Sequence, residues 1–251
     1  MTARRVLFCC SLFLAVCGRA TDALAQAQAQ PDESRFVFDV GFGIDVSLNG
    51  NVNSGGIGII QGQATAIVPN PYGDVYGSGV YFRFGGGYLL DDATELRGVF
   101  TFQSADADLV RLGDLGPSSL YGQFDDYQTL SLDFGVRRYM PLKETRFRVY
   151  GEGTIGLAFI DEINVLLAAP QSNLILDVTD FYDQTSAFTW GINAGVLFPV
   201  AERVDFNVQV GLRGVSGLSE VDQFVGTGLE DINNDSSRLT FPFVVGARFR
   251  F

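Results

Sequence analysis

Charged side chains recur at every second position within apolar segments of this chain. In residues 36–48, Asp39 and Asp45 alternate with large apolar residues, and in residues 147–159 Glu152 does the same. Acids and bases brought to one face in this way can form buried ion pairs, or line a water path that opens when the pairs rearrange. The candidate residues for such a network are Asp39, Asp45, Arg83, Glu95, Arg97, Asp133, Arg137, Arg148, Glu152, Asp205, Arg213, Arg248 and Arg250.

Other kinds of chemistry are excluded or disfavoured by composition. The chain has no histidine, which rules out a Ser-His-Asp site and removes the usual general base and a common zinc ligand. The net charge of −12 is unfavourable for contact with nucleic-acid phosphates. We therefore predict that the chain is not an enzyme, has no cofactor and no metal site, and binds no nucleic acid.

The first 25 residues have the pattern of a secretory signal peptide. Arg4 and Arg5 precede an apolar run at 6–17, and residues 23–25 (Ala-Leu-Ala) offer small side chains for cleavage. A membrane anchor is the alternative, but twelve residues are too few to cross about 30 Å of hydrocarbon as a helix. Lipidation at Cys17 is a second alternative, although valine precedes it where Gly, Ala or Ser is usual. We predict a signal peptide at 1–25 and one domain at 26–251, which would contain no cysteine because all three lie within the first 17 residues.

The elements that would position the charges are eight segments with period-two alternation, the signature of half-buried strands. In each segment one face is bulky and apolar, and the other is small, polar or charged. The segments are 36–48, 79–90, 94–103, 129–137, 147–159, 187–198, 204–213 and 239–251. The connections after the second, fourth and sixth segments are short, whereas the other four are long (49–78, 104–128, 160–186 and 214–238).

Eight strands with short turns at one end and long loops at the other are typical of an outer-membrane barrel. A soluble sandwich or lipocalin-like barrel is the alternative, but it would bury its bulky face, and an eight-stranded interior is too narrow for that many large side chains. The sequence therefore predicts an all-β fold: a transmembrane antiparallel up-and-down β-barrel of eight strands, with short periplasmic turns and four long extracellular loops.

The last segment adds a more specific resemblance. It alternates through Phe241 and Phe243 and continues to Phe249 and Phe251, which resembles the C-terminal signature of outer-membrane barrels. Over nearly its whole mature length the chain resembles the small OmpA-type and OmpX-type barrel superfamily. The resemblance implies a monomer in the Gram-negative outer membrane, in contact with its lipid and lipopolysaccharide. It also implies recognition by the barrel-assembly machinery through the C-terminal strand, with Phe249 and Phe251 as the assembly signature.

Charge balance favours a structural role for the lumen. The inward set has seven bases and six acids, as expected of paired charges that close the interior, and in the OmpA family such pairs are associated with gating. The long loops instead hold sixteen Asp and Glu residues, which we interpret as a solvated acidic rim. We predict a structural or surface-interaction role, such as envelope integrity or adhesion. The alternative is a low-conductance channel, or a transporter of small or hydrophobic solutes.

Three further features of the sequence lead to expectations. Residues 231–235 begin like an EF-hand loop, but Ser236 and Pro242 replace the required Gly and Glu, so we predict no calcium site there. Apolar runs at 57–68 and 163–178 predict hairpins that lengthen the barrel, with two more spanning hairpins as the alternative. Aromatic residues near strand ends predict lipid-facing girdles; they are Phe36, Tyr81, Tyr88, Tyr127, Tyr139, Tyr150, Tyr182 and Trp190.

Overall fold

The computed structural model describes residues 35–141, 146–172, 174–234 and 237–251. The segment predicted to be a signal peptide, 1–25, lies outside the described residues. Within the described part of the chain, no helix has the length and apolar character needed to cross a membrane.

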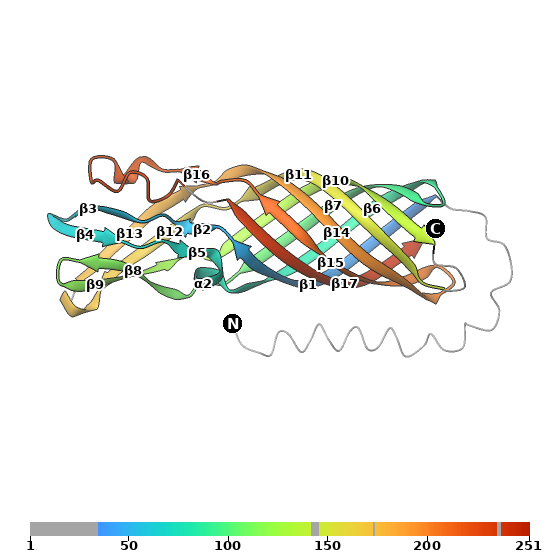
Figure 1. Ribbon diagram of the computed structural model, residues 1–251, viewed down its shortest axis with the longest axis horizontal. Helices are drawn as coiled ribbons and strands as arrows, with labels where there is room; N and C mark the ends of the chain where they lie inside the picture. The colour runs from blue at the N-terminus through green and yellow to red at the C-terminus, as the bar shows by residue number, and fades with distance from the viewer. Residues whose placement is uncertain (1–34, 142–145, 173, 235–236) are drawn as a thin grey trace.

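Eight long strands form a closed antiparallel barrel (Figure 1). Each strand pairs with the next barrel strand along the chain, and the first pairs with the last to close the wall. The strands are β1 (Phe36–Asn49), β6 (Ser78–Asp91), β7 (Thr94–Ala105), β10 (Tyr127–Pro141), β11 (Arg148–Ile160), β14 (Thr185–Ala201), β15 (Val204–Val215) and β17 (Arg238–Arg250). The predicted fold and strand number are confirmed, and the strands exceed the predicted segments by a few residues at most ends.

Alternation along each strand decides which side chains face outward, because successive side chains of a strand point to opposite faces. Ile44, Phe134 and Ile192 on the outer wall are 50%, 60% and 65% exposed, whereas Asp45 and Arg137 on the inner wall are fully buried. The bulky apolar face is therefore outside and the charged face inside, as predicted.

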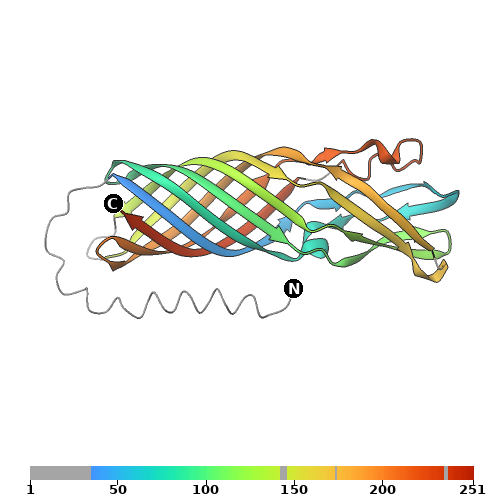
Figure 2. The ribbon, with the colours of Figure 1, turned by 180° about the vertical axis from the view of Figure 1, so that it is seen from behind.

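The long connections form a second region beyond one end of the barrel, which we call the extension (Figure 2). Its main sheet has the order β16-β13-β12-β9-β8-β4-β3. These strands are β3 (Gly56–Ile60), β4 (Gln63–Ile67), β8 (Leu109–Leu115), β9 (Ser118–Phe124), β12 (Ile163–Ala169), β13 (Leu174–Asp183) and β16 (Ser219–Glu220). The prediction of lengthening hairpins at 57–68 and 163–178 is confirmed, and the alternative of extra spanning strands is wrong. The hairpin β8–β9 was not predicted.

Shorter elements complete the extension near the barrel. β2 (Asn51–Asn53) pairs with β5 (Asn70–Pro71), and the single helical turn α2 (Tyr72–Tyr76) follows directly. Two 3-10 turns, η2 (Pro170–Ser172) and η3 (Asp222–Phe224), lie in the third and fourth long connections.

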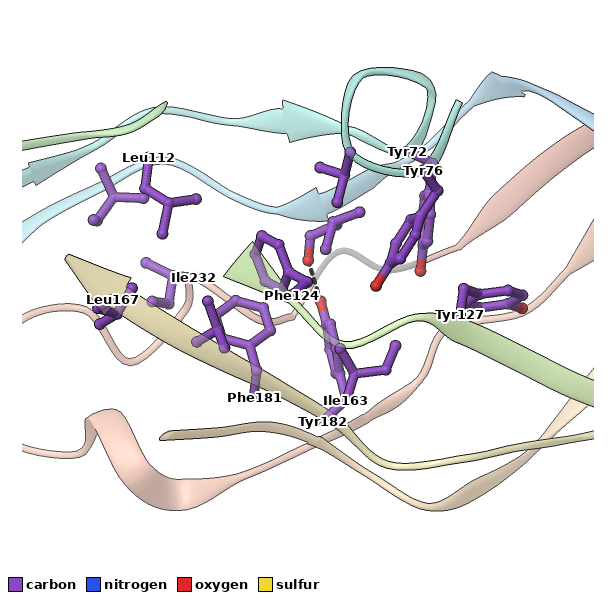
Figure 3. Packing of buried hydrophobic residues seen from close by; sticks show 14 of the residues in the cluster. Tyr72, Tyr76, Leu112, Phe124, Tyr127, Ile163, Leu167, Phe181, Tyr182 and Ile232 are labelled. Carbon is purple, nitrogen blue, oxygen red and sulfur yellow. Dashed lines mark hydrogen bonds between the residues drawn. The ribbon is translucent and has the colours of Figure 1, made fainter. Parts of the chain in front are cut away.

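The inside of the extension is an apolar core, in contrast to the polar inside of the barrel (Figure 3). Phe124, Ile163 and Phe181 lie at its centre and are at most 2% exposed. Tyr182 donates a hydrogen bond from its hydroxyl to the carbonyl oxygen of Val52 at 2.7 Å, which satisfies the one polar atom of that ring. The barrel is therefore covered at this end by a packed core.

Candidate functional site

Glu152 on β11 is the centre of an ion-pair cluster inside the barrel, the Glu152 cluster. Its carboxylate lies 2.7 Å from Nη2 of Arg137, 3.2 Å from Nη2 of Arg83 and 3.4 Å from Nε of Arg97. Asn193 donates a further hydrogen bond at 3.4 Å. Three guanidinium groups from β6, β7 and β10 thus meet on one carboxylate that is 3% exposed.

Two more carboxylates complete the Glu152 cluster from other strands. Asp39 on β1 lies 3.1 Å from Arg97, and Glu95 lies 2.8 Å from Nη2 of Arg248 on β17. Tyr139 donates its hydroxyl proton to Glu95. The cluster therefore contains four arginines and three acids from six strands, and its members are Asp39, Arg83, Glu95, Arg97, Arg137, Glu152 and Arg248.

Aromatic rings pack against the cluster on its side nearer the short turns. The guanidinium of Arg137 lies 3.8 Å from the ring centroid of Tyr150, a cation–π contact. Tyr139 packs edge-on against Tyr150 at 6.1 Å, and Leu197 is fully buried beside them. A Cβ atom at the inward-facing Gly195 would lie 2.4 Å from the Tyr150 ring, so the missing side chain provides the space that this ring fills.

A second polar cluster, the Arg213 cluster, lies nearer the extension. Arg213 donates to Ser131 at 2.7 Å and lies 3.9 Å from Asp133. Gln103 connects this group to Asp45, to which it donates at 2.6 Å. Residues of both clusters line a cavity of about 10 Å³ between them, which is room for about one water molecule.

The short-turn end of the lumen holds the remaining predicted charges. Asp205 lies 3.1 Å from Arg148 and 3.4 Å from Arg250, and both arginine side chains are about one-third exposed. All thirteen predicted charged residues thus lie on the inner face, eleven of them buried and these two arginines half-buried. Whether the network seals or gates the barrel stays a prediction.

Where the barrel meets the extension, Arg238 lies against aromatic rings. It donates to the Ser47 hydroxyl at 2.8 and 3.0 Å, and its guanidinium lies 4.5 Å from the Tyr127 ring centroid and 5.2 Å from that of Tyr72. Burial raises the pKa of Tyr76 well above its usual value, and Tyr127 nearby adds to the rise. Tyr76 therefore stays neutral and donates to the carbonyl oxygen of Asp125 at 3.1 Å.

Several aromatic residues of the interior were not expected there from the sequence. Five tyrosines assigned to lipid-facing girdles are at most 5% exposed and face the interior; they are Tyr81, Tyr127, Tyr139, Tyr150 and Tyr182. That part of the girdle prediction is wrong, while Phe36, Tyr88 and Trp190 are exposed as predicted. The signal for Tyr139 and Tyr150 was available, because each lies two residues from a charged residue of the same face, Arg137 and Glu152.

In the fourth long connection, residues 221–234 pack against the apolar core of the extension, and we call this segment the strap. Leu229 and Ile232 point into the apolar core, and the strap accepts backbone hydrogen bonds from Ser54 and Ile59 at 2.7 Å each. Glu230 fixes the turn of the strap, since its carboxylate accepts from the backbone N–H groups of Gly226 and Gly228. Its own backbone N–H, together with those of Gly228 and Gly226, lowers the pKa of Glu230 below its usual value.

The strap should therefore be stable to mild acid. Because the pKa of Glu230 is lower in the folded state, its contribution is fully present above the ordinary glutamate pKa and is lost only as the pH falls through the lowered value. We expect the protection of the Gly226 and Gly228 amides, measured relative to an unfolded chain at the same pH, to persist at the ordinary glutamate pKa and to fall only below it. In Glu230→Gln the protection should already be lower at neutral pH and should not change further as the pH is lowered. Equal protection in both proteins at every pH would contradict this role.

The arrangement of the two clusters is suited to fixing buried charged side chains in ion pairs and hydrogen bonds. Among the described residues, no group of three or more acidic or sulfur ligands is placed to hold a metal ion. The buried carboxylates instead face guanidinium groups, amides and hydroxyls. The geometry therefore supports a network of paired charges inside the barrel.

Comparisons with known proteins find similarity among solved structures but none by sequence. No protein-family model and no curated protein matches the sequence. Among solved structures, the Neisserial surface protein A is similar, with 11% identity, a TM-score of 0.47, and 87% of this chain and 98% of that chain covered. The outer membrane protein OprG from Pseudomonas aeruginosa gives 14% identity and a TM-score of 0.43, with 87% and 96% covered. The outer membrane protease OmpT from Escherichia coli gives 7% and 0.39, with 90% and 99% covered.

The fold is a closed eight-stranded barrel. At these identities and TM-scores the similarity concerns the fold alone and carries no argument about function. The absence of enzymatic activity stays a prediction.

Proposed function

We propose that the protein is an integral outer-membrane barrel with a sealed lumen. In this proposal the barrel anchors the extension, which is presented outside the cell for structural or surface contacts. The Glu152 cluster and the Arg213 cluster have a structural role as the filling of the barrel.

The outer wall supports insertion into a membrane. Large apolar side chains on the barrel exterior are 40–65% exposed at Phe38, Ile155, Phe188 and Ile192, an arrangement that water would disfavour. The barrel strands have 12 to 17 residues, whereas a tilted strand needs about 9–11 to cross a bilayer. Closure of the wall leaves no unpaired edge, which a membrane interior requires.

Two successive seals carry the proposal of a closed lumen. The first is the Glu152 cluster, which together with the tyrosine layer fills the barrel cross-section. The second is the apolar core of the extension, whose residues Leu115, Leu120 and Val165 are fully buried. A conducting path would have to disrupt both of these seals.

The partners expected from the sequence belong to this proposal. The apolar wall would contact membrane lipid, and the extension would emerge among lipopolysaccharide. Phe249 lies half-buried on β17 and Phe251 is 63% exposed, so the terminal aromatic ring is accessible to an assembly machinery. A monomer with a cleaved signal peptide remains our expectation.

Single-channel recording in a planar bilayer tests the proposal. We expect the refolded chain to give no discrete openings, and Glu152→Ala and Arg97→Ala to be silent as well, because the core of the extension still covers the barrel. The control is faster migration of the unheated sample in SDS gels, which identifies the folded barrel. Discrete openings whose conductance changes with these substitutions would contradict the sealed lumen and would favour the alternative, a low-conductance channel.

A further inference from the structure

The outer face of the extension carries a row of three exposed apolar side chains that crosses four strands, with Gln123 of β9 in the same row. Leu109 on β8, Leu166 on β12 and Val178 on β13 are 63%, 38% and 58% exposed. The strand register places them in line, because Leu109 and Leu166 both pair with Gln123 on β9, and Leu166 also pairs with Val178. We call these three residues the apolar row.

Acidic side chains lie beside the apolar row, on its barrel side. Asp180 pairs with Asn164, two residues from Leu166 along β12. The exposed carboxylate of Asp125 accepts from the backbone and the side-chain amide of Asn164 at 3.1 and 2.9 Å, which fixes its position. Asp180 accepts from Gln223 at 3.2 Å.

Positive charge on the extension is almost absent by sequence. The segments 50–77, 106–126, 161–184 and 216–237 contain sixteen Asp and Glu residues and one base, Arg111. Arg111 already donates to Asp114 at 2.7 Å. The surface around the apolar row is therefore complementary in charge to a cationic partner, whose approach it would accelerate.

The length of the apolar row matches the spacing of apolar residues along one face of an α-helix. Neighbouring strands lie about 4.8 Å apart, so the row extends over about 14 Å across three spacings, and the acids lie about 7 Å to one side. Apolar residues at i, i+3 and i+10 of an α-helix lie about 4.5 and 15 Å along its axis, close to the spacing of Val178, Leu166 and Leu109. Lys or Arg residues on the flank of such a helix would reach the acids.

We propose that the apolar row, together with Asp125 and Asp180, docks a cationic amphipathic helix of a partner protein or peptide. The apolar stripe of the helix covers Leu109, Leu166 and Val178, and its Lys or Arg residues face the two carboxylates. This inference rests on the proposed surface-contact role of the extension and assigns it a class of partner.

A labelled synthetic helix of leucine and lysine provides the probe. Its fluorescence anisotropy would be measured against the refolded chain in zwitterionic detergent, with empty micelles as the reference. We expect saturable binding, and a Kd raised about tenfold by Leu166→Ser, as loss of part of a buried leucine side chain implies. Asp180→Asn should raise the Kd about threefold, the size expected of one partly exposed charge pair.

Two matched controls test whether binding is specific to the apolar row. Ile57→Ser removes an aliphatic side chain that is 81% exposed on β3, an edge strand of the same sheet that is separated from β8 by β4, and should leave the Kd unchanged. A scrambled peptide of equal composition, which lacks the apolar stripe, should bind at least tenfold more weakly. Equal binding of both peptides, or equal Kd values for Leu166→Ser and Ile57→Ser, would overturn the proposal and indicate attraction by net charge alone. Absence of binding would also overturn it while leaving the sealed-barrel function intact, since that function fails only if the chain conducts.

Discussion

Replacement of Glu152 by glutamine is expected to lower the free energy of unfolding by about 3–5 kcal/mol, the cost typical of breaking a buried ion pair on one side. Glutamine keeps the shape of the side chain but removes the negative charge that faces Arg83, Arg97 and Arg137. Four buried arginines would then share two carboxylates.

Unfolding by urea in lipid vesicles measures this effect. Trp190 is the only tryptophan of the chain and is 39% exposed on the outer wall, so its fluorescence reports whether the barrel wall is in contact with lipid. Glu162→Gln is the matched control, since Glu162 is exposed in the extension, and its effect should stay within about 0.5 kcal/mol. The double variant Glu152→Gln/Arg137→Met should recover part of the loss because it also removes one unpaired charge. Identical unfolding of Glu152→Gln and the unmodified chain would show that the cluster does not stabilise the barrel.

Gly43→Ala should disrupt the seam where the first and last strands close the barrel. A Cβ atom at Gly43 would lie 1.8 Å from the carbonyl oxygen of Phe243 on β17, so the two backbones must separate. Backbone atoms cannot rotate away as a flexible side chain can, and we expect a loss of about 3 kcal/mol or more, at the upper end of overpacking effects.

The fraction of refolded protein that migrates faster when unheated in SDS gels measures closure. Gly43→Ala should lose most of this compact form. Gly153→Ala is the matched control on β11, where an added Cβ atom has no neighbour within 4 Å, and it should refold like the unmodified chain. A fully compact Gly43→Ala protein would show that the seam tolerates wider spacing than the structure indicates.

The sequence was informative about the barrel because its strands obey a rule that is local. Side chains alternate between two faces of a strand, so the parity of Asp39, Glu152 or Arg213 alone assigns each to the inner face. The same rule assigns Tyr139 and Tyr150 to the interior, where the structure has them. The girdle prediction is wrong for these two residues because parity, and not nearness to a strand end, decides which face a side chain occupies.

The extension was less predictable because much of it lacks period-two alternation. Apolar runs near Ile57 and Ile163 indicated hairpins, but the strap at 221–234 has no strand pattern and is held by the burial of Leu229 and Ile232 in the core. Such a segment is ordered by what it packs against, which the segment itself does not encode in a recognisable repeat.

The sequence by itself determined the number of strands, their approximate ends, and the face on which each charge lies, because each of these follows from alternation within one segment. Only the tertiary structure decided which charges meet. Arg83 on β6 reaches Glu152 on β11 across two intervening strands of the wall, and this contact depends on the register and closure of the whole barrel. Closure also pairs β1 with β17. The packing of the long connections against one another places the apolar core of the extension beyond one end of the polar lumen. These are relations between distant segments, and alternation within a single segment does not specify them.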